Sequence, residues 1–378
     1  MLYRLLSGDM PRSKVLAVIL LAILAGLAMA PFLFPSVKAL SVAAKVLIFV
    51  VLVASFDLLL GYTGIVSFAH TMFFGIGAYG VAIATTRMGA TWTALATGVA
   101  CALLLSLLLS LVIGLFSLRV RAIFFAMITL AVATAFMTLA SQLSEWTGGE
   151  DGLTFRLPKI LTPAHEFSEE PFLGVSLDGR LLTYYLLFVA AVVLVLMLLR
   201  IVNSPFGRVL QAIRENEFRA ESIGYRVVVY RTTSSVLSAL FATLAGAMLA
   251  IWLRYNGPDT SLSFEIMMDC LLIVVIGGMG TIYGPVIGAV LFLIAQSYLQ
   301  DVLRMGSEAV TSLPWLSALL SPDRWLLWLG LLFVLSVYYF PTGIVGRLRQ
   351  AAQPAPGRPQ PNAAARPAPV PAGTTSST

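Results

Sequence analysis

The chain has 378 residues, of which 59% are hydrophobic and only 11% are charged, and its formal net charge is +6. Soluble domains carry roughly 25% charged residues, so this composition excludes a water-soluble protein and indicates a polytopic membrane protein. The basic residues are spread over short loops, without the extended Lys/Arg patch interleaved with aromatic residues that is typical of nucleic-acid binding.

Apolar stretches recur along the chain, and about 20 apolar residues suffice for a helix to cross a bilayer. The first stretch could instead be a signal peptide, because Ala28-Met29-Ala30 imitates a cleavage site, but its length and the many later stretches favour a first transmembrane helix. The sequence predicts an all-α protein with ten membrane-spanning helices, over residues 15–34, 42–60, 65–85, 93–117, 122–141, 183–202, 233–253, 264–284, 286–303 and 325–341.

Two of these spans are less clearly defined than the others. Residues 61–79 could re-enter the membrane instead of crossing it, and the joint between the eighth and ninth spans is short, at Gly284-Pro285. Cys101 and Cys270 both lie inside apolar stretches, so we expect two thiols and no disulfide framework.

The basic residues predict the orientation of the chain, because Lys and Arg gather in cytoplasmic loops. This rule places both termini and the loop 203–231 in the cytoplasm, on the strength of that loop's arginines and of Arg4, Arg12, Arg119, Arg121, Arg347 and Arg349. The loop 143–182 then lies outside, with the acidic residues Glu145, Glu150, Asp151, Glu166, Glu169, Glu170 and Asp178. We expect one transmembrane domain over 1–349 and a disordered Pro/Ala-rich cytoplasmic tail over 350–378, which has no apolar run to bury.

The cytoplasmic loop 203–231 is predicted to form two short helices. Ser204-Pro205 is a helix start signal, Asn216 can cap a second helix, and Gly224 can end it. The first helix has an apolar face made of Phe206, Leu210 and Ile213. Such an amphipathic element could lie on the anionic inner leaflet, or it could dock a protein partner.

Glycine interrupts two of the predicted spans. It lets helix backbones approach closely, and the spacing of Gly280, Gly284 and Gly288 is typical of such packing. It can also break a helix where open backbone lines a transport cavity, and both uses stay open here. The residues expected to pack or break the helices are Gly61, Gly64, Gly277, Gly278, Gly280, Gly284, Pro285 and Gly288.

Polar and ionisable side chains inside spans are costly, so they are candidates for function. Ser67 and His70 are three residues apart and are expected to share a helix face. The candidate substrate path consists of Asp57, Thr63, Ser67 and His70. Glu265 and Asp269 open the eighth span, where we expect them to be interfacial and solvated.

A simpler interpretation of His70 is an imidazole that is hydrogen-bonded between two helices, and we favour it. The other histidine, His165, lies in the predicted outer loop, so a metal site is not expected. None of the lysines follows a glycine, which excludes a phosphate-binding Gly-Lys-Ser/Thr loop, and no Gly-x-Ser-x-Gly motif is present. The sequence therefore predicts a protein with no catalytic residues and no cofactor, which does not hydrolyse ATP by itself.

Three motifs together resemble one family, the permease subunits of branched-chain amino acid ABC transporters of the LivM type. They lie at residues 57–79, 207–224 and 276–288, in the order and spacing of that family, and the likeness covers roughly residues 40–300. By this resemblance the element 205–224 is the coupling helix that docks on an ATPase. The residues that match its pattern are Arg214, Glu217, Glu221 and Gly224.

The resemblance implies a bacterial inner-membrane permease that pairs with a homologous permease, two cytoplasmic ATP-binding subunits and a solute-binding protein outside. The expected solute is a branched-chain amino acid, with urea or another amino acid as alternatives. Two departures leave the solute open, since Asp57 stands where many members have asparagine and the outer loop 143–182 is long.

Two other classes of function would make different demands on the sequence. An ion-coupled secondary transporter would use Asp57 or Asp269 as its coupling carboxylate. A membrane-embedded enzyme would need a catalytic constellation, and the sequence offers none.

Overall fold

The computed structural model describes residues 14–34, 36–117, 122–163, 178–309 and 319–351 of the chain. Within this part nearly all regular structure is helical, as predicted. Several sequence predictions concern residues outside it: the loop positions of Arg4, Arg12, Arg119, Arg121, His165, Glu166, Glu169 and Glu170, and the tail from residue 352 onward.

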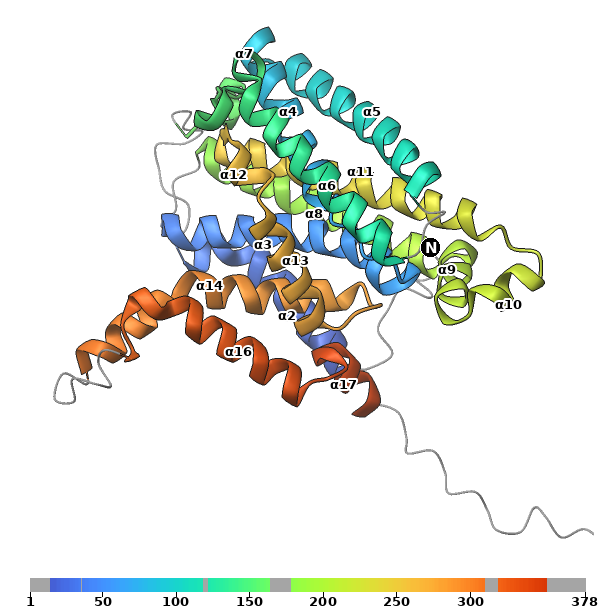
Figure 1. The fold of residues 1–378 in the computed structure, drawn as a ribbon. Coiled ribbons are helices and arrows are strands. Elements are labelled where there is room, and N and C mark those ends of the chain that lie inside the picture. Colours follow the sequence, from blue (N-terminus) through green and yellow to red (C-terminus); the bar gives the residue numbers. More distant parts are fainter. Residues whose placement is uncertain (1–13, 35, 118–121, 164–177, 310–318, 352–378) are drawn as a thin grey trace, which may run out of the picture.

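The long helices form a single bundle (Figure 1). Nine helical segments of the described chain are long and apolar enough to cross a membrane. The long helices are α2 (Lys14–Leu33), α3 (Val37–Asp57), α4 (His70–Met88), α5 (Trp92–Ser117), α6 (Ala122–Gln142), α8 (Gly179–Asn203), α11 (Val227–Leu253), α13 (Phe264–Gly277), α14 (Tyr283–Ala309) and α16 (Trp325–Tyr339).

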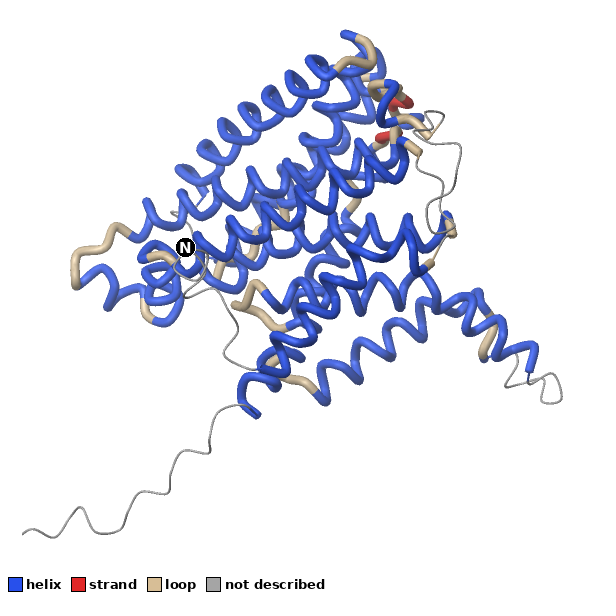
Figure 2. The backbone as a smooth tube through the Cα atoms, turned by 180° about the vertical axis from the view of Figure 1, so that it is seen from behind, coloured by secondary structure: helices blue, strands red, loops and turns tan. Residues whose placement is uncertain are grey.

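Shorter elements lie mostly at the two ends of the bundle. The helices α9 (Pro205–Glu215) and α10 (Glu217–Ser222) project at one end, and α17 (Gly343–Ala351) follows α16. At the opposite end the strands β1 (Leu153–Thr154) and β2 (Tyr255–Asn256) pair antiparallel (Figure 2). That end also carries α7 (Ser144–Thr147), the 3₁₀ turns η2 (Gly149–Asp151) and η3 (Lys159–Leu161), and α12 (Pro258–Ser261); a further 3₁₀ turn, η4 (Pro322–Arg324), precedes α16.

Helix α4 takes the place of the predicted third span, but it is not among the nine segments apolar enough to cross. Its glycines, His70 and Arg87 lower its hydropathy. Most of its nineteen residues are buried, and it packs mainly against α5 and α11. The helix is therefore enclosed largely by protein, which explains why it can be less apolar than a lipid-facing span.

The predicted joint at Gly284-Pro285 is wrong by several residues. Helix α13 ends at Gly277, the chain turns over 278–282, and α14 begins at Tyr283. Pro285 lies in the first turn of α14, where its missing N–H is no loss because those amides have no intrahelical partner. Gly280 lies in the turn, so it does not share a helix face with Gly284 and Gly288.

The third predicted span also differs at its start. Residues 64–69 are irregular, and α4 begins only at His70, because Gly64 adopts a left-handed conformation (φ 75°) that ends the preceding helix. Ser67 therefore does not share a helix face with His70 as predicted. The charged loop is shorter than 203–231, since α11 begins at Val227 and carries Arg231.

The closest helix crossing in the core joins α4 to α11. A Cβ atom added to Gly77 would overlap the backbone of Thr243, and one added to Gly246 would overlap the backbone of Phe74. The small residues Ser235, Ala239 and Ala242 on α11 are buried as well. Small side chains thus let the two backbones touch, which is how membrane helices gain packing energy.

We expect the substitution Gly246→Leu to lower the melting temperature of the detergent-solubilised protein by about 5 °C or more, because overpacking costs about 1–3 kcal/mol. The obstacle is the backbone of α4, which cannot rotate away as a side chain can. The matched control is Gly330→Leu on α16, where an added Cβ meets nothing within 4 Å. Equal melting temperatures for the two variants would contradict the role of this crossing.

Candidate functional site

Asp57 is the last residue of α3 and is completely buried. Its carboxylate accepts hydrogen bonds from the backbone N–H groups of Gly280, at 3.0 Å, and Thr281, at 3.1 Å. A buried carboxylate needs such partners, because its desolvation is otherwise very costly. Asp57 therefore ties the end of α3 to the turn between α13 and α14, which is 223 positions away in the sequence.

The helix changes from α to the wider π form directly after Asp57. Residues Leu58–Thr63 form a π-helix that ends at Gly64. Gly61 lies four residues after Asp57, and a Cβ atom there would overlap both the Asp57 carboxylate and the backbone N of Gly280. The missing side chain at Gly61 therefore leaves the space in which the carboxylate reaches the turn.

Arg214 reaches the same place from α9. Its guanidinium donates a hydrogen bond to the carbonyl oxygen of Gly61. A Cβ atom added to Gly280 would lie 3.1 Å from Nη1 of Arg214, and one added to Gly64 would lie 3.0 Å from its Cγ. One arginine of the charged loop thus touches both glycine-broken segments. We call the set of Asp57, Gly61, Arg214, Gly280 and Thr281 the three-way joint.

The local sequence explains how α9 presents this arginine. Ser204 caps α9, Pro205 occupies its first turn, and Asn216 accepts a hydrogen bond from the N–H of Arg219 at 2.9 Å to cap α10. Gly224 adopts a left-handed conformation (φ 95°) just after α10. These start and stop signals agree with the two predicted helices. Of the predicted apolar face, Leu210 and Ile213 are buried, and Phe206 stacks on Tyr230.

The other residues predicted for coupling lie on or after α10. Both oxygens of Glu217 accept hydrogen bonds from Arg231 of α11, at 2.7 and 3.0 Å, so this carboxylate is already paired within the chain. Glu221 and Gly224 are exposed. Two large apolar side chains protrude beside them, since Phe218 is 80% exposed and Ile223 is 68% exposed. We call Phe218, Glu221, Ile223 and Gly224 the α10 tip.

The remaining candidate path residues are buried, and two of them, Thr63 and His70, have polar partners inside the protein. His70 Nε2 lies 2.9 Å from Ser55 Oγ and 3.2 Å from the carbonyl oxygen of Leu52, so it bridges α4 and α3 as the simpler interpretation predicted. Thr63 Oγ1 lies 2.9 Å from Ser234 Oγ of α11. Ser67 is also buried. A role of Asp57, Thr63, Ser67 or His70 in contacting a solute stays a prediction.

Sequence reasoning missed the small polar partners of these residues. Ser238 donates to the carbonyl oxygen of Ser55 at 2.6 Å, and Ser234 meets Thr63. Ser234 and Ser238 are four residues apart on α11 and both fully buried, so they face the same neighbours. Their helical spacing inside an apolar stretch was the signal that could have identified them.

Glu265 is exposed, as expected for an interfacial residue, but Asp269 is not simply solvated. Asp269 is half-buried, accepts a long hydrogen bond of 3.5 Å from Gln296 of α14, and interacts electrostatically with Lys45 of α3. The difference arises because Asp269 lies one turn further into the bundle. Among the described residues, no three His, Cys, Asp or Glu side chains gather in a way that could hold a metal ion.

Comparisons with known proteins show which family the chain resembles. Residues 38–337 match the family described as the branched-chain amino acid transport system permease component. The permease LivM of Salmonella typhimurium LT2 is 28% identical over 293 residues, which cover 72% of this chain and 68% of LivM. A probable LivM of Methanocaldococcus jannaschii is 24% identical over 61% of each chain.

A more distant group of relatives also matches. The autoinducer 2 import permease LsrC of Salmonella typhimurium LT2 is 29% identical over 46% of this chain and 45% of LsrC. No solved structure matches the chain. Because the family match spans most of the sequence, including all three parts of the three-way joint, the chain belongs to the permease components of branched-chain amino acid transport systems.

Proposed function

We propose that the chain is the membrane-spanning permease subunit of an ABC importer for branched-chain amino acids, powered by ATPase subunits on other chains. The family and the LivM relatives, which are named for this solute, support the proposal. LsrC is named for a different solute but matches less than half of the chain, so it carries less weight. The observation that carries the coupling mechanism is the three-way joint, which connects an exposed charged element to two broken spans.

The proposed orientation puts α9 and α10 in the cytoplasm of a bacterial inner membrane, with both termini on the same side. The arginines of α9 and α10 and of the segment before α11 support this assignment through the positive-inside rule. The opposite end, with β1, β2 and α12, then faces the solute-binding protein. A homologous permease and two ATP-binding subunits would complete the importer.

The α10 tip is the proposed docking surface for the ATPase. Exposed apolar side chains flanked by charges are typical of a protein interface, and Phe218 and Ile223 protrude next to Glu221. Glu217 is proposed to support this surface, because its pair with Arg231 fixes α10 against α11. A force on the tip would therefore be passed to α11 as well as to α9.

Arg214 is the proposed transmission residue. When the ATPase subunits close and push α9, Arg214 moves with that helix and pulls on the carbonyl oxygen of Gly61. Asp57 then carries the displacement to the turn at Gly280 and Thr281. The tightly packed helices would follow as rigid bodies, as in other switching proteins.

We expect Arg214→Ala to lower ATP-driven uptake of L-leucine into proteoliposomes by about tenfold or more, a typical size for the loss of coupling between two sites. The measurement uses the importer assembled with its partner permease, ATPase subunits and binding protein. The control Arg208→Ala removes an exposed arginine from the same helix and should change uptake by less than about twofold. Equal losses for both variants would contradict a specific role of Arg214.

Asp57→Ala is expected to abolish uptake and to lower the melting temperature, because it leaves the N–H groups of Gly280 and Thr281 without acceptors, at about 1–3 kcal/mol each. Asp57→Asn should retain most of the uptake and most of the thermal stability, since its amide oxygen can still accept a hydrogen bond. Thermal unfolding in detergent and L-leucine uptake test the pair. An alanine variant as stable and active as the wild type would overturn the joint.

Phe218→Ala is expected to weaken binding of the purified ATPase subunit by about tenfold, which corresponds to about 1.4 kcal/mol. The dissociation constant can be measured by interferometry with the permease held in nanodiscs. The control is Phe124→Ala on α6, a phenylalanine that is also exposed, at 57%, but lies on another helix. If both variants bind the ATPase as the wild type does, the α10 tip is not the docking surface.

A further inference from the structure

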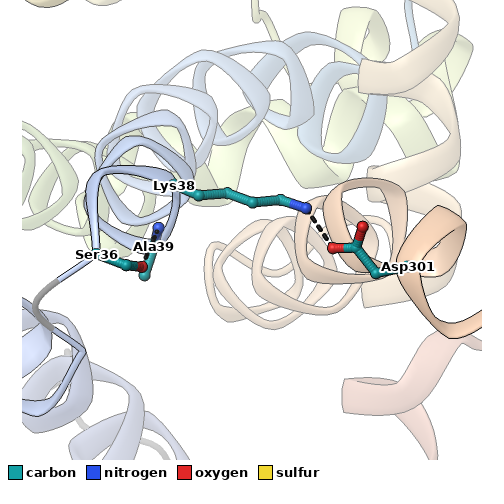
Figure 3. Close-up of polar contacts among 4 residues, drawn as sticks. All are labelled: Ser36, Lys38, Ala39 and Asp301. Atoms are coloured by element: carbon teal, nitrogen blue, oxygen red, sulfur yellow. Dashed lines mark hydrogen bonds and ion pairs between the residues drawn. The ribbon is translucent and has the colours of Figure 1, made fainter. Parts of the chain in front are cut away.

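Two lysines project from the same side of α3, since Lys38 and Lys45 are seven residues, or about two turns, apart. Each of them faces a carboxylate on another helix. Lys38 forms an ion pair with Asp301 of α14, beside the Ser36 cap that accepts from the N–H of Ala39 (Figure 3). Lys45 is attracted electrostatically by Asp269 of α13.

The two lysines differ in how they meet their carboxylates. The pair of Lys38 and Asp301 is in direct contact, and both side chains are more than half exposed. Lys45 and Asp269 are half-buried, and no direct ion pair or hydrogen bond joins these two described residues. The ammonium of Lys45 instead lies 5.5 Å from the ring centroid of Phe49. A positive and a negative group therefore lie near each other inside the spans without direct contact.

Gln296 of α14 completes this group and has an unused acceptor. Its Nε2 donates to Asp269 at 3.5 Å, whereas its buried Oε1 has no hydrogen-bond partner. A buried acceptor without a donor costs about 1–3 kcal/mol, so this oxygen is available to a donor from outside the chain. Asp269 and Gln296 thus offer two oxygens to one cationic group.

The position of the group suits a transport path. At 1.5 Å per residue, Lys45 lies about 18 Å along α3 from Asp57, within the helix and away from the three-way joint. Helices α3, α13 and α14 pack against one another, so the three side chains converge from three spans. Ionisable side chains at such positions are costly and usually mark the path of an ion or solute.

We propose that Lys45, Asp269 and Gln296 form a subsite for a zwitterionic amino acid. The α-carboxylate of the solute accepts hydrogen bonds from Lys45, while its α-ammonium donates to Asp269 and to Oε1 of Gln296. The solute then compensates both charges and supplies the donor that Oε1 of Gln296 lacks. The inference rests on the proposed function and narrows it, because an uncharged polyol or sugar-like solute could compensate neither charge.

The test measures kcat/KM for L-leucine uptake by the complete importer in proteoliposomes. Lys45→Met and Asp269→Asn should each lower kcat/KM by about tenfold or more. Lys45→Arg keeps the positive charge and should leave kcat/KM within about threefold of the wild-type value. Lys38→Met is the matched control, because it removes a lysine of the same helix from a directly paired, exposed contact. It should change kcat/KM by less than about twofold.

The double variant Lys45→Met/Asp269→Asn separates recognition from structure. Removing both charges leaves no uncompensated charge in the spans, so a purely structural pair would regain wild-type uptake. If the residues form a subsite, kcat/KM of the double variant stays about tenfold or more below that of the wild type. Assembly of each variant with its partners, followed by size-exclusion chromatography, identifies variants that fail to fold.

Each remaining outcome is decisive. If the wild-type importer takes up leucine and the single or double variants have the same kcat/KM as the wild type, the subsite is overturned and the proposed function stands. A wild-type importer that takes up ribose and no leucine would overturn both the subsite and the assignment of the solute.

Discussion

Interrupting a helix in a membrane frees backbone groups that lipid cannot satisfy, and this constraint organises the protein. The chain breaks its helices twice, after Leu58–Thr63 and at 278–282, and it brings the two breaks together. The carboxylate of Asp57 accepts from two of the amides freed in the second break. Part of the backbone freed in the second break is thus satisfied by protein.

The same arrangement connects the breaks to the end of the bundle. Arg214 donates to a carbonyl oxygen of the π-helix that leads into the first break, so α9 is attached next to an irregular part of the spans. Further along α4 and α11, away from this place, the helices are closely packed, as the contact of Gly77 and Gly246 with neighbouring backbone shows. Rigid helices joined at irregular segments are suited to motion by rotation about those segments instead of by bending.

The features that depend only on neighbouring residues could be predicted from the sequence. Ser204-Pro205 and Asn216 specify the two short helices through capping, which depends only on neighbouring residues. The predicted position of the second break was wrong, because apolar residues continue through 278–282 and the helix is stopped by the positive φ of Gly278, with Gly280 following in the same turn. The sequence likewise indicated that residues 61–79 could re-enter the membrane instead of crossing it, but not that α5 and α11 enclose α4.

Contacts between distant residues could not be predicted in this way. The bond between Asp57 and Gly280 crosses 223 positions, and sequence spacing carries no information on how two helices are aligned with each other. The same holds for the meeting of Lys45 with Asp269, since each residue alone is one charge in a span. Asp269 was expected to be solvated, but it is half-buried. The expectation failed because the depth of α13 in the bundle depends on its packing against other helices and not on its own composition.

The bidentate contact between Glu217 and Arg231 has a consequence for how the importer assembles. It holds α10 in one orientation before any partner arrives, with its capping and its final glycine turn already formed. A preorganised surface loses little conformational entropy on association, so more of the contact energy is retained as affinity. Subunits that must stay attached through many cycles of opening and closing would gain from a binding surface that is shaped in advance.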